Sequence, residues 1–138
     1  MNRRKNISSG GFTLIELLVV VSIILILMGF LVPKFSGYQS KAKNTKAINT
    51  GKQIQTAAMA SYGENDGEFS EQDVGDSVKQ LTSAENPKVS CDEGGSKQIS
   101  VTYTSDKKEY RVDVDADKNS YTVSEVDNSG NESRIFPK

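Results

Sequence analysis

The sequence has no histidine and no tryptophan, and it contains a single cysteine, Cys91, among its 138 residues. Without histidine it lacks the commonest acid–base group near neutral pH and a principal zinc ligand. With one cysteine, no disulfide can form within the chain. Ser–His pairs and Gly-rich phosphate loops are also absent. The sequence therefore predicts a protein that is not an enzyme and needs no cofactor.

Net charge is −1, so the chain as a whole lacks the strongly basic balance that is typical of nucleic-acid-binding proteins. The charge is unevenly spread, because the first third is apolar and basic and residues 63–138 are acidic and polar. Large apolar side chains are thinly spread in that C-terminal part. It can bury only a small core, and a sheet of that size gains stability from a helix packed against it.

Residues 12–32 form a long apolar run in which only Thr13, Glu16 and Ser22 are polar. As an α-helix this run would be about 31 Å long, enough to cross the hydrocarbon core of a bilayer. Glu16 is its one ionisable residue. A carboxylate inside a bilayer costs about 2.5–3.5 kcal/mol on insertion scales, so an acid at this position indicates a function.

A short basic leader precedes the run, with Arg3, Arg4 and Lys5 and no acid, and it ends in Gly10-Gly11. A secretory signal would need a small-x-small cleavage site after the apolar run, and none is present. A plain membrane anchor would explain the length of the run. It would leave Glu16 and the glycine pair unexplained.

The segment from Gly11 to Leu18, GFTLIELL, behind a basic leader, resembles the class III signal of type IV pilins and pseudopilins. The resemblance covers residues 1–62 and is specific at residues 11–18. It implies that a membrane-embedded prepilin peptidase cuts after Gly11 and N-methylates the new terminus at Phe12. It also implies that Glu16 serves filament assembly and that a cytoplasmic ATPase and an assembly platform protein drive that assembly.

The charges give a physical reason for this role of Glu16. Cleavage after Gly11 would expose an α-amine on Phe12, which stays cationic when it is monomethylated. Glu16 of the same chain or of a neighbouring copy could pair with that amine. Desolvation offsets much of the attraction, so the pair would mainly set the register of subunits, and the apolar side chains would supply the packing energy.

Gly29 and Pro33 predict a weak point in the helix. Proline lacks the N–H that would bond the carbonyl four residues earlier, and its ring crowds that carbonyl. A simple kink at the membrane exit is one interpretation. Local melting, which would let a fibre stretch, is the other, and a proline near Pro33 is common in the family that the N-terminal segment resembles.

Residues 33–62 continue the helical pattern, and small or apolar residues recur along one side at Ala47, Gly51, Ile54, Ala58 and Tyr62. This side should cover a sheet, and Gly63 is placed as the C-terminal cap. Several lysines lie mostly elsewhere on the helix. They would form a solvated face or meet acidic heads of neighbouring subunits, and DNA binding by them is a weaker alternative. They are Lys41, Lys43, Lys46 and Lys52.

The remaining residues, 63–138, predict a small antiparallel head of three to five strands. Ser70 is expected to cap a short helix whose apolar residues are Val74, Val78 and Leu81. Period-two alternation then predicts strands at residues 98–104, 109–114 and 120–126, with further strands at 89–91 and 133–136. The predicted class is α+β: a cleaved leader at 1–11, a long helix at 12–62 that crosses the membrane over 12–32, and the head packed on its second half.

An alternating acidic run is formed by Asp113, Asp115, Asp117 and Asn119. It is similar to the start of a calcium-binding loop but lacks the glycine and the final glutamate of that motif. The ordinary interpretation is an exposed strand face that runs into a turn. Calcium binding is the minor alternative.

Together these features predict a precursor inserted in the cytoplasmic membrane that becomes an extracellular type IV pilus subunit. Its partners would be its own copies and the membrane before assembly. A major pseudopilin of type II secretion or of competence DNA uptake is the nearer alternative. A monomeric membrane-anchored binding domain is the distant one.

Overall fold

The computed structural model describes residues 10–91 and 97–138. The basic residues of the expected leader, Arg3, Arg4 and Lys5, lie outside the described residues. The chain divides into two compact units, Met1–Gln39 and Ser40–Lys138. Helix α1, Leu14–Glu64, contributes its first half to one unit and its second half to the other.

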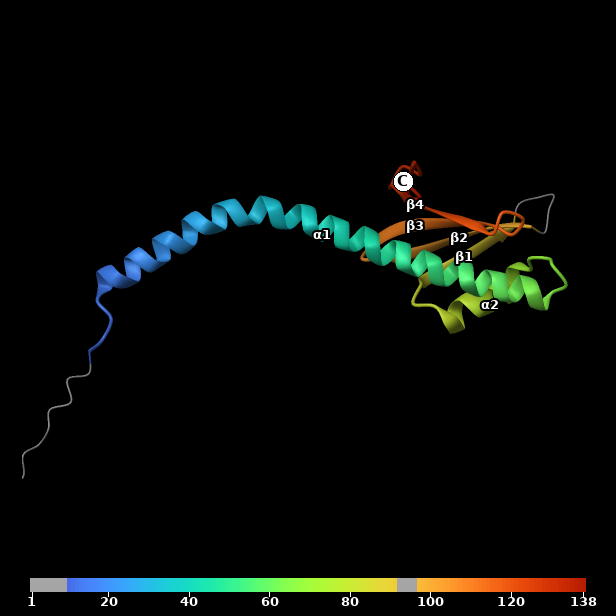
Figure 1. The fold of residues 1–138 in the computed structure, drawn as a ribbon, viewed down its shortest axis with the longest axis horizontal. Helices are drawn as coiled ribbons and strands as arrows, with labels where there is room; N and C mark the ends of the chain where they lie inside the picture. Colours follow the sequence, from blue (N-terminus) through green and yellow to red (C-terminus); the bar gives the residue numbers. More distant parts are fainter. Residues whose placement is uncertain (1–9, 92–96) are drawn as a thin grey trace, which may run out of the picture. The chain divides into compact units, whose positions relative to one another are not determined.

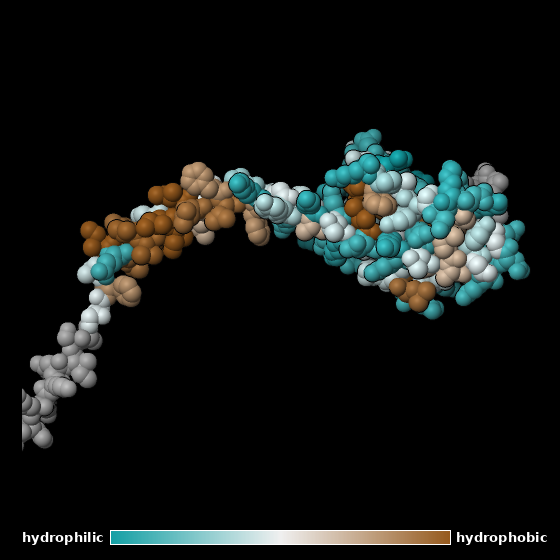
Figure 2. All heavy atoms as spheres, in the orientation of Figure 1, coloured by the Kyte–Doolittle hydropathy of each residue, from teal (hydrophilic) through white to brown (hydrophobic). Residues whose placement is uncertain are grey.

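The first unit consists, in its described part, of a short extended segment and the apolar half of α1. Every large apolar side chain in this described part is exposed, with exposed fractions between 45% at Val21 and 92% at Phe12. Figure 2 shows these hydrophobic side chains covering the N-terminal part of α1 on the visible face. By length and composition α1 can cross a membrane, and none of its apolar window is buried within the described chain.

The second unit combines the C-terminal half of α1 with α2 and a five-stranded antiparallel sheet in which the strands follow the order of the sequence (Figure 1). The expected α+β class is confirmed. The elements after α1 are α2 Glu71–Leu81, β1 Glu85–Cys91, β2 Gln98–Ser105, β3 Lys108–Asp115, β4 Ser120–Val126 and β5 Glu132–Phe136.

The core of this unit lies between α1 and one face of the sheet. The expected stripe on α1 is buried at Ala47, Gly51, Ile54 and Ala58, and Tyr62 is half-buried at its end. Helical periodicity adds residues that the sequence interpretation omitted, which are Thr50, Ala57 and Ser61. The stripe therefore consists mainly of small residues, which allow the helix to approach the sheet closely.

Alternation along the strands supplies the other side of the core. Val101 pairs with Val112, and Val112 pairs with Val123, so one row of valines crosses three strands under α1. In the next inward row Tyr103 pairs with Tyr110, and the two rings stack with centroids 5.8 Å apart. The Tyr103 hydroxyl donates to the Ala47 carbonyl at 2.6 Å, and burial raises its pKa, so the phenol stays protonated.

The C-terminal end of α1 differs from the prediction. Gly63 was expected to cap the helix, but α1 continues to Glu64 and the left-handed residue is Asp66, at φ 56°. The Gly67 N–H donates to the Tyr62 carbonyl at 3.0 Å, which closes a Schellman turn. Aspartate tolerates the left-handed conformation better than most residues, so this end does not require a glycine at position 63.

Helix α2 begins as expected, because the Ser70 side chain accepts a hydrogen bond from the Asp73 N–H. Val74 and Val78 are fully buried. Leu81, the third apolar residue of the predicted helix, has 66% of its surface exposed. Leu81 is the last residue of α2, and it lines a groove together with residues of α1.

Candidate processing and assembly site

Residues 10–13 form no helix or strand and lead directly into α1. A Cβ added at Gly10 or Gly11 would meet no atom within 4 Å, and neither glycine has a positive φ. Phe12 follows with 92% of its surface exposed. The peptide bond between Gly11 and Phe12 therefore lies in an accessible, non-helical segment.

Thr13 and Glu16 form a capping box at the start of α1. The Glu16 N–H donates to the Thr13 hydroxyl oxygen at 3.3 Å, and the Thr13 N–H donates to Glu16 Oε2 at 3.0 Å. Each side chain thus satisfies a backbone donor that the first turn of a helix leaves free. The carboxylate also lies at the positive end of the helix dipole, where negative charge is favoured.

This geometry gives Glu16 a second role beside the one inferred from its charge. Its Oε2 atom is occupied by the cap, while no hydrogen bond to Oε1 is found within the described part of the chain. One carboxylate can therefore hold the helix start and still present an oxygen to a cation. The threonine-x-x-glutamate spacing was visible in the sequence, and the sequence interpretation did not use it.

The predicted weak point lies inside α1, which is continuous through Gly29 and Pro33 in the single chain. Pro33 has no N–H to donate, so the Gly29 carbonyl lacks its usual helical partner. A Cβ at Gly29 would meet nothing within 4 Å, which shows that no packing inside the described chain requires this glycine. Melting in a fibre remains a prediction.

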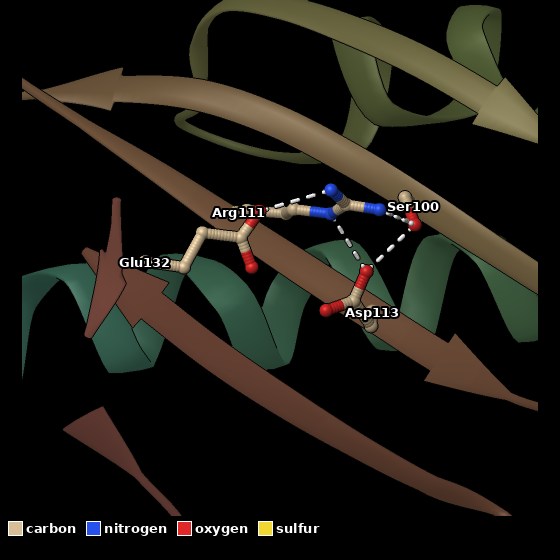
Figure 3. A network of polar contacts seen from close by, with 4 residues as sticks. All are labelled: Ser100, Arg111, Asp113 and Glu132. Carbon is tan, nitrogen blue, oxygen red and sulfur yellow. Dashed lines mark hydrogen bonds and ion pairs between the residues drawn. The ribbon is translucent and has the colours of Figure 1, made fainter. Parts of the chain in front are cut away.

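The calcium candidates follow the outer face of β3 into the β3–β4 turn. Asp113 Oδ1 accepts from Ser100 Oγ at 2.6 Å and from Arg111 Nε at 2.9 Å. Figure 3 shows how Arg111 joins both of them and reaches Glu132 on β5, with Nη1 3.0 Å from Oε1. The guanidinium thus ties three strands together.

The next two carboxylates of the run also meet cations. Asp115 pairs with Lys118 at 3.2 Å, and Asp117 pairs with Lys97 at 2.9 Å. The pKa of Asp115 is lowered chiefly because the Lys118 backbone N–H donates to it, with partial burial acting in the opposite direction. Asn119 accepts from Gln55 of α1 at 3.4 Å. Within residues 10–91 and 97–138, no three acidic, His or Cys side chains are grouped to hold a metal.

The lysines of α1 in the second unit have different surroundings. Lys46 pairs with Asp106 in the β2–β3 turn at 3.2 Å. Lys43 is half-buried, and Lys41 and Lys52 are exposed. The predicted basic side of this unit therefore reduces to Lys41 and Lys52.

Comparison with known proteins places the similarity at this N-terminal site. Residues 7–32 match the family model described as the prokaryotic N-terminal methylation motif. The chain is 40% identical over 63 residues to the type IV major pilin protein PilA of Myxococcus xanthus (strain DK1622), which is 46% of this chain and 29% of that protein. It is 42% identical over 48 residues to a fimbrial protein of Pseudomonas aeruginosa, 35% of this chain and 31% of the relative.

The matched region spans less than a third of the length of each of these relatives. No solved structure matches the chain significantly.

Proposed function

We propose that this chain, whose N-terminal segment is that of the type IV pilin family, is the precursor of a subunit that self-assembles into a filament at the cell surface. The single observation that carries the proposal is Glu16, the only acid in an exposed apolar helix, held at the helix start directly after the glycine pair. The activity is structural, and no catalytic step is assigned to the chain.

The exposed apolar half of α1 supports the proposal. A row of exposed leucine, isoleucine, valine and phenylalanine side chains is unstable in water, because each square ångström of apolar surface left in contact with water costs about 25 cal/mol. Before assembly the bilayer covers this surface. In the filament the same surface packs against copies of itself, so the helix can leave the membrane without meeting water.

Gly11 and Phe12 are the proposed processing site. No contact and no backbone conformation within the described chain requires a glycine at position 11. A requirement for it would therefore come from another molecule, the membrane-embedded prepilin peptidase. Cleavage leaves Phe12 as the amino terminus, and the same enzyme methylates it.

Glu16 then pairs with the new amine of an adjacent copy. The cap occupies Oε2, so Oε1 faces the incoming cation and the helix start stays formed during the exchange. An unpaired carboxylate in the bilayer is unfavourable, and an amine at a matching depth relieves that cost. The pair selects the register, while the surrounding apolar contacts supply the affinity.

Substitution of Glu16 tests the proposal. Glu16→Val should leave a processed, membrane-inserted protein but abolish filaments, measured by electron microscopy and immunoblot of sheared surface material. Ser22→Val is the matched control, because Ser22 is polar in the same run and its hydroxyl bonds only the Leu18 carbonyl, at 2.7 Å. Abundant filaments from Glu16→Val would refute the role and would favour a monomeric membrane anchor.

Processing is tested separately by mass spectrometry of the amino terminus. Gly11→Val should retain the leader, whereas Gly10→Val serves as the neighbouring control. If the Gly11→Val chain still begins at Phe12, the cleavage assignment is wrong. Long fibres with this chain as the main component distinguish a pilus from the short fibre of a pseudopilin.

A further inference from the structure

The acidic residues between positions 64 and 76 stand apart from the ion pairs of the second unit. Every ion pair within residues 10–91 and 97–138 involves a strand of the sheet or a turn next to one. Residues 64–76 contain six acids and no lysine or arginine, and none of these acids joins such a pair. We call this stretch the acidic segment; its acids are Glu64, Asp66, Glu68, Glu71, Asp73 and Asp76.

Part of the acidic segment is explained by the chain itself. Glu71 and Asp73 lie in the first turn of α2, where the helix dipole favours them, and both accept hydrogen bonds. Glu64, Glu68 and Asp76 have no side-chain hydrogen bond or ion pair with any described residue. Glu64 even lies at the C-terminal end of α1, where the dipole opposes a negative charge. These three carboxylates contribute nothing visible to the stability of the single chain.

A complementary surface lies on the side of α1 that faces away from the sheet. Lys41 and Lys52 are exposed, form no ion pair within the described chain, and are eleven residues apart, about three turns, so they share one side of the helix. Between Glu16 and Glu64 the chain has five lysines and no acid.

Beside Lys52 is a groove of ≈ 540 Å³, which contains the exposed Leu81 at the end of α2. Figure 2 shows a small hydrophobic patch over this end of α2, separate from a second one higher on the head. Lys41 and this groove together form what we call the groove face. The residues that line the groove include Asn49, Lys52, Gln53, Thr56, Ala60 and Leu81.

We propose that the acidic segment of one copy of this chain docks on the groove face of a second copy. The inference rests on the proposed filament function and identifies a contact between heads. The charged residues of the two surfaces are separate on one chain, because Glu64 lies about 18 Å beyond Lys52 along α1, although the groove itself extends to Ala60. A contact between different patches is heterologous, so it repeats from copy to copy and builds an open filament when the rotation between copies does not close into a ring. The charges set orientation and register, and Leu81 loses its exposed surface to the incoming copy.

Charge reversal in the full-length protein tests the contact. One variant reverses the acidic segment at Glu64→Lys, Glu68→Lys and Asp76→Lys. A second reverses the groove face at Lys41→Glu and Lys52→Glu. A third carries all five changes. The control reverses two exposed lysines elsewhere on the head, Lys88→Glu and Lys107→Glu, which have no ion pair among the described residues.

Sheared filaments are quantified by immunoblot relative to the processed chain in the membrane fraction. Each single-surface variant should lose about tenfold or more of its filaments, because like charges then meet at every contact. The five-fold variant should recover most of them, and the control should match the wild type. The recovery also shows that the reversed chains fold.

Two results would overturn the proposal in distinguishable ways. If the wild type forms filaments and a single-surface variant forms as many, or if the combined variant shows no recovery, the head contact is wrong while the filament function stands. If the wild-type chain forms no filament at all, the filament function and the contact fail together.

Discussion

Replacing Gly51 by alanine tests how closely α1 lies on the sheet. A Cβ at this position would lie 2.7 Å from Val123 Cγ2 and 3.2 Å from Val112 Cγ2. Both valines are fully buried, so neither methyl group can move away without displacing the core. Overpacking of this kind costs about 1–3 kcal/mol.

Helix propensity acts in the opposite direction and must be separated from the clash. Alanine in place of glycine inside a helix stabilises by about 1 kcal/mol. Gly75 in α2 provides the control, since a Cβ there would also meet a valine methyl, Val89 Cγ2, but at an ordinary 3.7 Å. Gly75→Ala should therefore stabilise by about 1 kcal/mol. The free energy of unfolding of Gly51→Ala should be about 1–3 kcal/mol lower than that of Gly75→Ala, because both variants gain the same helix propensity and only Gly51→Ala creates the clash.

The assay is urea unfolding of a fragment of residues 34–138, which contains the whole second unit. The transition midpoints should separate while the denaturant slope stays constant. In a domain of this size a difference of 1 kcal/mol also shifts the melting temperature by about 4–8 °C. Equal stability of Gly51→Ala and Gly75→Ala would show that the helix does not approach the valine row as described.

The same fragment tests three further features. Tyr103→Phe should lower the free energy of unfolding by about 1 kcal/mol, because it removes the hydrogen bond to the Ala47 carbonyl. Tyr110→Phe should be neutral or stabilising, because the buried Tyr110 hydroxyl has no partner among the described residues. A larger loss of stability for Tyr110→Phe than for Tyr103→Phe would refute this assignment. Calcium should leave the melting temperature unchanged, because the carboxylates of Asp113, Asp115 and Asp117 already pair with cations of the chain. A rise in the melting temperature on adding calcium would favour calcium binding by the acidic run. The Asn131 side chain is the chief cause that lowers the pKa of Asp127. The ionised Asp127 therefore stabilises the folded state above the ordinary pKa near 3.9, and this contribution is lost as the pH falls through the pKa of the folded state. Asp127→Asn should weaken the loss of stability at acid pH, and an unchanged acid dependence would argue against the turn.

Much of the fold was predictable because it depends on local periodicity. The three-and-four spacing along α1 and the alternation of valine and tyrosine in β2, β3 and β4 each follow from burial of one face. Strand β1 is longer than the predicted 89–91, since it begins at Glu85 and includes Pro87. As an edge strand with a shift of register between Glu85 and Lys88, it tolerates a proline that would argue against a central strand.

The parts that could not be predicted depend on tertiary register or on competing local rules. Arg111 reaches Ser100 on β2 and Glu132 on β5 only because the sheet aligns those strands. Asp66 rather than Gly63 ends α1, because two residue types can adopt the left-handed conformation and the sequence does not choose between them. The capping box of Thr13 and Glu16 is recognisable from its spacing alone, whereas the structure shows which carboxylate oxygen it occupies.

The distribution of satisfied and unsatisfied groups indicates where this chain meets other molecules. The sheet pairs many of its own charges, as Arg111, Lys97 and Lys108 show. Helix α1 is different on both of its halves: the first exposes apolar side chains along its length, and the second exposes Lys41 and Lys52 with no opposite charge among the described residues. Apolar surface is unfavourable in water and needs a cover, whereas exposed lysines are hydrated and gain only modestly from an opposite charge. In the filament proposed above, another copy of the same chain would cover the apolar first half of α1 and supply the opposite charges for Lys41 and Lys52.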